Sequence, residues 1–204
     1  MEKGGSQLLV STPFSLFKSP PTKRMNPIAV IEKYYRPETE LYQILMKHST
    51  DVAEYACRLA QKYGSEANKD FVYEAAMLHD IGIFLTNAPS ICCSGESGYI
   101  YHGILGAELL RREGLLEHAL VAERHTGTGI YPEEIASRGL DFPPDRIYYP
   151  ISLEEQLICY ADLFFSKTKL EGPKNVEQIR RSVSKWGEES LARFEEMHSR
   201  FSLL

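Results

Sequence analysis

Six ionisable side chains occupy inward-facing positions in otherwise apolar segments of this sequence. They are His48, His79, Asp80, His102, His125 and Asp162, and they include four of the six histidines of the chain. Burying several imidazoles and carboxylates without partners is costly, because each group loses its hydration. A bound metal ion removes that cost, since it accepts the imidazole lone pairs and neutralises the carboxylates. The sequence therefore predicts a metal site in the interior of the protein.

The predicted ligands contain no thiolate. Imidazole and carboxylate ligands suit Fe, Mn, Co, Ni or Zn, and the residue types leave the identity of the ion open. Two such ions, roughly 3.5–4 Å apart, can activate water and hold both ends of a phosphoryl displacement. Catalysis then comes from charge and positioning and needs no covalent intermediate. The residue types are compatible with such chemistry, but they do not select it by themselves.

The elements that must position these ligands read as helices. Capping residues, apolar stripes and glycine stops predict where the helices begin and end. No alternation of apolar and polar residues persists long enough to predict a sheet. The sequence thus predicts an all-α fold, a single helical bundle with the metal site in its core. The expected helices span residues 27–36, 38–64, 69–80, 99–114, 115–127, 132–138, 153–167 and 175–201.

The position of each histidine along its helix decides whether it faces inward. His48 lies one turn before Val52, on the apolar stripe of its helix. His118 competes with His125, because a spacing of seven residues places both on nearly the same helix face. We prefer His125, since it begins the glycine-rich segment "HTGTG", which is typical of the flexible rim of a site.

The ordered set of ligands resembles the HD-domain superfamily of metal-dependent phosphohydrolases. The resemblance is carried by "KHSTDVAEYA", "MLHDIG", "YHGILGAELL", "AERHTGTG" and "ICYADLFFSK", within residues 40–170. It implies that one metal ion is held by His48, His79, Asp80 and Asp162. His102 and His125 then allow a second ion, with Asp80 bridging the two. The resemblance therefore implies two divalent transition-metal ions and gives Asp80 a catalytic role.

Within this superfamily the chain looks closest to the YqeK-like, HDIG-type hydrolases that split dinucleoside tetraphosphates. The expected substrate is therefore a nucleotide or dinucleoside polyphosphate, cleaved by attack of a metal-bound hydroxide. We expect Lys167, Arg124 and Thr126 to contact this substrate. The segment "NAPSICCSGESGY", residues 87–99, has the composition of a flexible lid, and a plain surface connection is the alternative.

Three other functions stay open. The segment "GTGIYP" is similar to the HD-GYP cyclic-dinucleotide phosphodiesterases, but those enzymes carry two adjacent histidines where this chain has Arg124 and His125. Some HD-fold proteins look like di-iron oxygenases, which use the same ligand types. A non-catalytic nucleotide sensor would keep the metals without turnover.

The overall charge argues against nucleic-acid polymers as partners. The net charge is −5 at pH 7 and the pI is about 5.7. A basic stripe with interleaved aromatic residues, which would follow a nucleic-acid strand, is absent from the sequence. We therefore expect a small phosphorylated nucleotide as the partner, and no particular oligomeric state follows.

The remaining features predict a cytoplasmic protein with a short tail. No apolar run approaches the roughly 18 residues of a membrane-spanning helix, so no membrane partner is expected. The four cysteines form no C-x-x-C pair, which indicates free thiols in a reducing compartment. Residues 1–25 are rich in Ser, Thr and Pro and predict a disordered tail, with a transit peptide as the alternative. Residues 26–204 then form the HD domain with its C-terminal helix.

Overall fold

The computed structural model describes residues 25–203 of the chain. The predicted tail, residues 1–25, lies outside the described residues except for Met25. The backbone N–H of Met25 donates to Glu74 Oε1 at 3.1 Å, and its side chain packs against the hydrophobic core. Met25 is therefore part of the folded domain.

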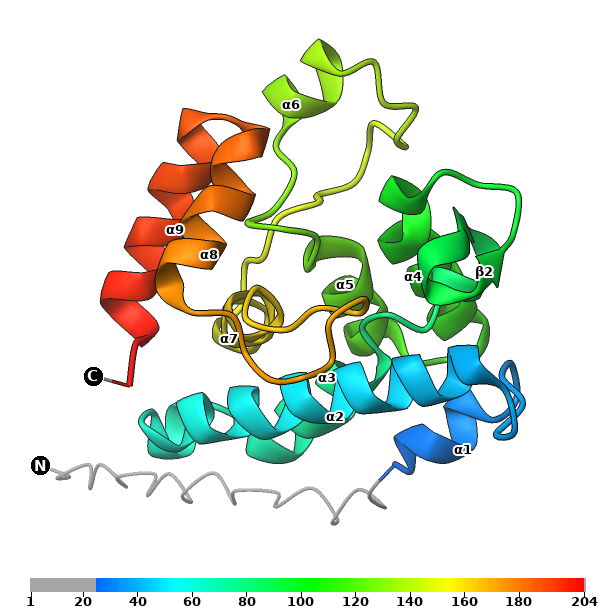
Figure 1. Cartoon of the computed structure of the whole chain (residues 1–204). Helices are drawn as coiled ribbons and strands as arrows, with labels where there is room; N and C mark the ends of the chain where they lie inside the picture. The colour runs from blue at the N-terminus through cyan, green and yellow to red at the C-terminus, as the bar shows by residue number, and fades with distance from the viewer. Residues whose placement is uncertain (1–24, 204) are drawn as a thin grey trace, which may run out of the picture.

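The described chain is a bundle of α-helices connected by turns and short 3-10 helices (Figure 1), which confirms the predicted all-α fold. One small antiparallel sheet pairs β1, Asn87–Ala88, with β2, Cys93–Ser94. None of the described helices is long and apolar enough to cross a membrane. The helices are α1 Pro27–Ile31, α2 Glu40–Gln61, α3 Lys69–Leu78, α4 His102–Arg112, α5 Leu116–Arg124, α6 Pro132–Ser137, α7 Leu153–Asp162, α8 Val176–Val183 and α9 Glu188–Phe201.

The predicted N-caps set the beginnings of several helices. The side chains of Asn26, Asn68, Ser152 and Asn175 accept hydrogen bonds from backbone N–H groups in the first turns of α1, α3, α7 and α8. These bonds satisfy donors that have no partner inside the helix. The first helix is shorter than predicted, because α1 ends at Ile31 and the chain continues in turns toward α2.

The C-terminal segment contains two helices where the sequence predicted one, and that prediction is wrong. A 3-10 turn, Ser184–Trp186, follows α8, and Gly187 then adopts a φ of 118° before α9 begins. Side chains rarely tolerate this φ, so glycine permits the chain to reverse here. Figure 1 shows α8 and α9 as an adjacent pair on one side of the molecule, and the two helices contact each other.

The core lies where α2, α3, α5 and α7 meet. α3 contacts all three of the other helices, and α4 packs along α5. Leu45, Val52, Leu78 and Leu157 are fully buried in this core. Burial of a leucine or valine stabilises the fold by about 1.5–3 kcal/mol relative to exposure. The core thus provides a rigid frame for the polar residues within it.

Close backbone packing joins the segment after α3 to α4. A Cβ atom at Gly82 would lie 2.3 Å from both the backbone nitrogen of Gly106 and the carbonyl oxygen of His102. Only glycine fits at this contact. The glycine of the "HDIG" motif therefore allows α4, and His102 at its beginning, to approach the segment that carries Asp80.

The predicted lid, residues 87–99, is folded onto the domain. Backbone hydrogen bonds from Asn87 to Ser97 and from Gly95 to Thr86 tie the hairpin to its neighbours, at 2.7 and 2.9 Å. Ile91 is buried in the core. The segment therefore packs on the domain, and its role as a flexible lid stays a prediction.

Candidate metal centre

The six predicted ligands come together from separate parts of the fold. His48 lies in the middle of α2, and His79 and Asp80 directly follow α3. His102 begins α4, His125 ends α5 and Asp162 ends α7. Their ligand atoms form two groups, each with all atoms within 4.8 Å of one another. The first group is His48, His79, Asp80 and Asp162. The second group is Asp80, His102 and His125.

The first group is built around two carboxylates. His48 Nε2 lies 3.1 Å from Asp80 Oδ2 and 3.0 Å from Asp162 Oδ1. His79 Nε2 lies 3.1 Å from the same oxygen of Asp80 and 3.6 Å from Asp162 Oδ1. Two imidazole nitrogens and two carboxylate oxygens thus surround one point, and this set suits a divalent transition metal.

The second group uses the other oxygen of Asp80. His102 Nε2 and His125 Nε2 lie 3.4 and 3.5 Å from Asp80 Oδ1. Asp80 is fully buried and belongs to both groups, with Oδ2 facing the first and Oδ1 facing the second. A single carboxylate is therefore placed to bridge two cations.

Backbone carbonyls fix the orientation of three of the four imidazoles. The Nδ1 atoms of His79, His102 and His125 lie 2.6, 2.7 and 2.8 Å from the carbonyl oxygens of the residues three positions earlier. A carbonyl oxygen only accepts, so each Nδ1 carries the hydrogen. In the neutral ring Nε2 then presents a lone pair to the centre, which is the usual outer-shell arrangement of a metal-binding histidine.

The resulting arrangement of lone pairs fits a cation. His102 Nε2 and His125 Nε2 lie 3.0 Å apart. With both Nδ1 atoms protonated, two lone pairs face each other at this distance, which is unfavourable unless a positive charge lies beside them. In addition, neither buried oxygen of Asp80 accepts a hydrogen bond of good angular geometry, although cationic nitrogens are close. These residues therefore fit one or more bound metal ions.

The charged groups of the centre shift one another's pKa values. Burial raises the pKa of Asp80, but Lys167 and His79 outweigh burial and hold it well below its ordinary value. Burial likewise raises the pKa of Asp162, and Lys167 and His48 reverse this and hold it well below its ordinary value. Both carboxylates are thus ionised at neutral pH and present negative charge to a cation.

The same surroundings shift the pKa values of two of the imidazoles in opposite directions. Burial lowers the pKa of His102 to about 3, so this ring is neutral and ready to bind a metal. Burial also lowers the pKa of His79, but Asp80 outweighs it and raises that pKa to about 10. Because a metal ligand must be deprotonated, binding of an ion at His79 releases a proton.

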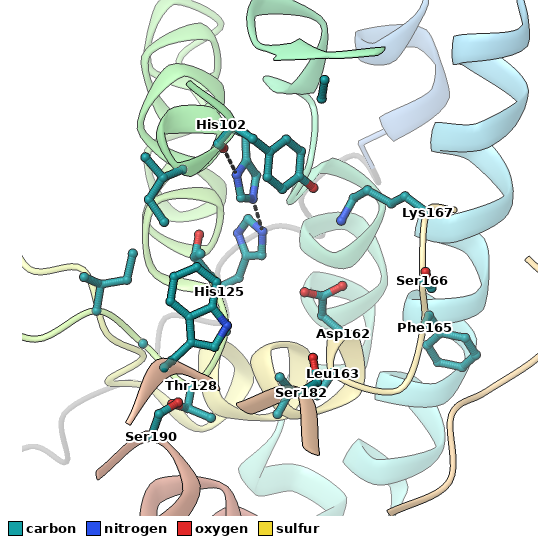
Figure 2. A pocket seen from close by; sticks show the side chains of 18 of the residues that line it. His102, His125, Thr128, Asp162, Leu163, Phe165, Ser166, Lys167, Ser182 and Ser190 are labelled. Carbon is teal, nitrogen blue, oxygen red and sulfur yellow. Dashed lines mark hydrogen bonds between the residues drawn. The ribbon is translucent and has the colours of Figure 1, made fainter. Parts of the chain in front are cut away.

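A cavity of about 500 Å³ opens beside the centre, within the range of small-molecule sites. Figure 2 shows His102, His125 and Asp162 at this cavity, with Lys167 on the facing segment. Lys167 Nζ lies 2.6 Å from Asp80 Oδ2. Thr126 also lines the cavity. Lys167 and Thr126 are therefore placed where sequence reasoning expected them, within reach of a ligand at the centre.

Arg124 does not face this cavity, although sequence reasoning placed it at the substrate. Its guanidinium pairs with Glu155 at 3.0 Å and donates to the carbonyl oxygen of Ile147 at 3.3 Å. Glu155 also accepts from the backbone N–H of Ile151 at 2.7 Å. Arg124 thus joins α5 to the loop before α7.

The competing histidine lies elsewhere. His118 Nε2 is 3.6 Å from Glu74 Oε2, and its ring packs edge-on against Phe71. Cys159, one turn before Asp162, is buried and donates its thiol hydrogen to the carbonyl oxygen of Gly127 at 3.2 Å. His118 thus lies outside both groups of candidate ligands, which agrees with the choice of His125.

Sequence reasoning missed several residues that line the cavity. Tyr99 stacks on His102, with ring centroids 4.6 Å apart. Arg138, Lys174 and Trp186 line the cavity as well. Tyr99 had a recognisable signal, because it lies three residues before the predicted ligand His102, and its carbonyl oxygen accepts from the ring of His102. Arg138 directly follows α6, Lys174 lies just before α8 and Trp186 lies in the turn between α8 and α9, and local sequence gives no indication that these three positions meet at the cavity.

Comparisons with known proteins identify the family. The HD domain family matches residues 45–165, a range that contains all six ligands. An uncharacterized protein of Methanocaldococcus jannaschii is 36% identical over 146 residues, which cover 69% of this chain and 78% of that protein. No solved structure matches the chain.

Two tRNA (cytidine(56)-2'-O)-methyltransferases also match. The enzyme of Thermoplasma volcanium is 35% identical over 61% of this chain, and that of Picrophilus torridus is 31% identical over 62%. The chain spans only about a third of these two proteins, 32% and 33%. The family match covers more than half of the chain and includes the whole metal centre. The chain therefore belongs to the HD domain family.

Proposed function

We propose that this protein is a metal-dependent phosphohydrolase that cleaves a nucleotide or a dinucleoside polyphosphate. The observation that carries the proposal is the position of Asp80, whose two oxygens face two separate groups of ligands. A carboxylate in this position would allow two divalent ions to lie close together, an arrangement that can stabilise both ends of a phosphoryl displacement. We expect Fe, Mn, Co, Ni or Zn, because the ligands are imidazoles and carboxylates.

When bound, such ions supply positive charge to phosphate oxygens and lower the pKa of water. The side chains of this protein contribute the rest. His48, His79 and Asp162 would hold one ion, and His102 and His125 would hold the other. Lys167 adds a fixed positive charge beside Asp80, at the wall of the cavity, where it can bind a phosphate oxygen. Thr126 offers a hydroxyl to the same ligand.

The size of the cavity supports a small substrate. About 500 Å³ is enough for a ligand of nucleotide size, whereas a polymer needs an extended groove of positive charge. The names of the two relatives describe methyl transfer to tRNA. Their match to this chain covers only a third of each protein, so it gives no reason to carry that activity over. The small cavity supports the proposal of a nucleotide or dinucleoside polyphosphate substrate, as for YqeK-like hydrolases.

The alternatives differ in specific ways. An HD-GYP phosphodiesterase has two adjacent histidines where this chain has Arg124 and His125. Here Arg124 turns toward Glu155. A di-iron oxygenase would use the same ligands, but it would consume oxygen. A nucleotide sensor would bind its ligand without turnover.

A substrate panel tests the proposal. Purified protein is loaded with Mn, Co or Fe and incubated with diadenosine tetraphosphate, nucleoside triphosphates, cyclic dinucleotides and single-stranded RNA. The reaction is run in heavy-oxygen water, and the products are analysed by mass spectrometry. We expect heavy oxygen in a phosphate product of a small nucleotide. Efficient cleavage of RNA alone would overturn the substrate class, and oxygen uptake with an organic co-substrate would overturn the reaction class.

A further inference from the structure

The turn between α8 and α9 brings Trp186, the single tryptophan of the chain, to the cavity that opens at the metal centre. The residue is 52% exposed. A large aromatic side chain is usually well buried, so an indole that lines a cavity and remains half exposed has surface available for a ligand. Gly187, with its φ of 118°, reverses the chain directly after Trp186 and fixes the position of this turn.

Arg138, at the end of α6, covers part of the indole. Its guanidinium carbon lies 4.1 Å from the centroid of the Trp186 ring, which is a cation–π contact. In the range 25–203, no carboxylate pairs with this guanidinium. Arg193 differs, because it pairs with Glu134 in the same wall at 2.7 Å. The guanidinium of Arg138 is therefore available to a ligand in the cavity.

We propose that Trp186 and Arg138 bind the planar nucleobase of the substrate while its phosphates lie at the metal centre. This inference rests on the proposed function and specifies its substrate: a nucleotide, in preference to an inorganic polyphosphate or a sugar phosphate. His102, His125 and Lys167 line the same cavity as Trp186 and Arg138, so one ligand can contact both. Stacking on an aromatic ring strengthens binding on the order of 10- to 100-fold for each base.

The type of contact also predicts which bases are accepted. Every base presents a π face, so stacking on an indole discriminates weakly between them. Arg138 packs over the indole, and its guanidinium can add a cation–π contact to any base, which again discriminates weakly between bases. We therefore expect adenine and guanine nucleotides to bind with similar affinity, and a sugar phosphate without a base to bind much more weakly.

The fluorescence of wild-type protein gives a direct test, because Trp186 is its only indole. Metal-loaded protein is titrated with AMP and, in parallel, with ribose 5-phosphate, which keeps the phosphate and sugar but lacks the base. We expect saturable quenching by AMP and none by ribose 5-phosphate at equal concentration. Free N-acetyl-tryptophanamide, titrated in the same way, corrects for absorption by the nucleotide.

Kinetics of variants give an independent test. In Trp186→Ala we expect the KM for the nucleotide substrate to rise about tenfold or more, with kcat within about twofold. Trp186→Phe restores part of the loss, because it keeps an aromatic face. Leu116→Ala removes another exposed apolar side chain, 64% exposed and outside the cavity, and should change neither constant. The KM and kcat of Arg138→Ala are compared with those of Arg181→Ala, which changes an exposed arginine of α8 outside the cavity.

The outcomes separate this inference from the proposed function. Turnover of nucleotides without AMP quenching, together with an unchanged KM in Trp186→Ala, would overturn the base-binding role and leave the hydrolase intact. Saturable quenching by AMP without turnover of any substrate would support the base-binding role and overturn the hydrolase. Should Trp186→Ala fail to fold, the wild-type titration and Trp186→Phe still decide the question.

Discussion

The Nε2 atoms of His102 and His125 lie 3.0 Å apart, while each ring holds its Nδ1 against a backbone carbonyl oxygen. Two lone pairs at this distance are stabilised by a shared cation. We therefore predict close to two transition-metal ions per chain in protein prepared without oxygen. His125→Ala should lose about one ion, because it removes a ligand of the second group alone. Elemental analysis measures both.

His118→Ala is the matched control for this experiment. It removes a histidine of α5 that is partly buried against Glu74 and Phe71, away from the centre. Its metal content should equal that of wild type. Loss of an ion in His118→Ala, with full retention in His125→Ala, would show that the ligands are assigned wrongly.

Metal removal should destabilise the fold. Asp80 and Asp162 are both ionised and lie close together beside His48, so a cation relieves their repulsion. A ligand present at 100 times its Kd stabilises a folded protein by about 2.7 kcal/mol. We expect a chelator to lower Tm by several degrees and added Mn or Co to restore it, as measured by differential scanning fluorimetry. An equal Tm with and without chelator, at a metal content shown to change, would contradict this.

The sequence was sufficient to select the six side chains that the fold brings together, because they sit at places that local rules describe. His48 follows the apolar stripe of a long helix, and Ser152 and Asn175 cap their helices as their types predict. The order of the ligands along the chain then carried the resemblance to the family. These features depend on residues near one another in sequence, which is why they could be read without a structure.

The walls of the cavity could not be predicted in the same way. Arg124 looked available beside His125, but its partner Glu155 lies 31 residues later in the chain. The pattern of residues 175–201 continues as a helix until the backbone of Gly187 reverses it. Only that reversal places Trp186 at the cavity. A contact between distant segments decides the case of Arg124, whereas the helix break and the position of Trp186 follow from a glycine inside an otherwise helical pattern, which is only a weak local signal.

Lys167 should be required for turnover more than for metal binding. Its ammonium group is 2.6 Å from Asp80 Oδ2 and faces the cavity. Loss of a positive charge aimed at a transition state commonly costs about 100-fold or more in kcat. We predict that Lys167→Ala lowers kcat/KM by that order while the metal content stays near wild type. Steady-state kinetics and elemental analysis on one preparation measure both.

Lys169→Ala provides the control, because this exposed lysine lies two residues later in the same turn and outside the cavity. It should behave as wild type in both measurements. If Lys167→Ala also loses its metals, the lysine supports the centre structurally, and the assignment to substrate would have to be abandoned.

Gly82→Ala should damage the second group of ligands from a distance. The new Cβ would lie 2.3 Å from backbone atoms of Gly106 and His102, neither of which can rotate away. α4 must shift to accept it, and His102 moves with the helix. We expect a loss of stability of about 1–3 kcal/mol, the usual cost of overpacking, together with loss of about one metal ion. Urea unfolding and elemental analysis measure these effects.

Gly98→Ala is the matched control, since its Cβ would meet nothing closer than 3.7 Å and the φ of Gly98 is −60°. Stability and metal content equal to wild type in Gly82→Ala would mean that the close packing of α4 does not hold His102 in place.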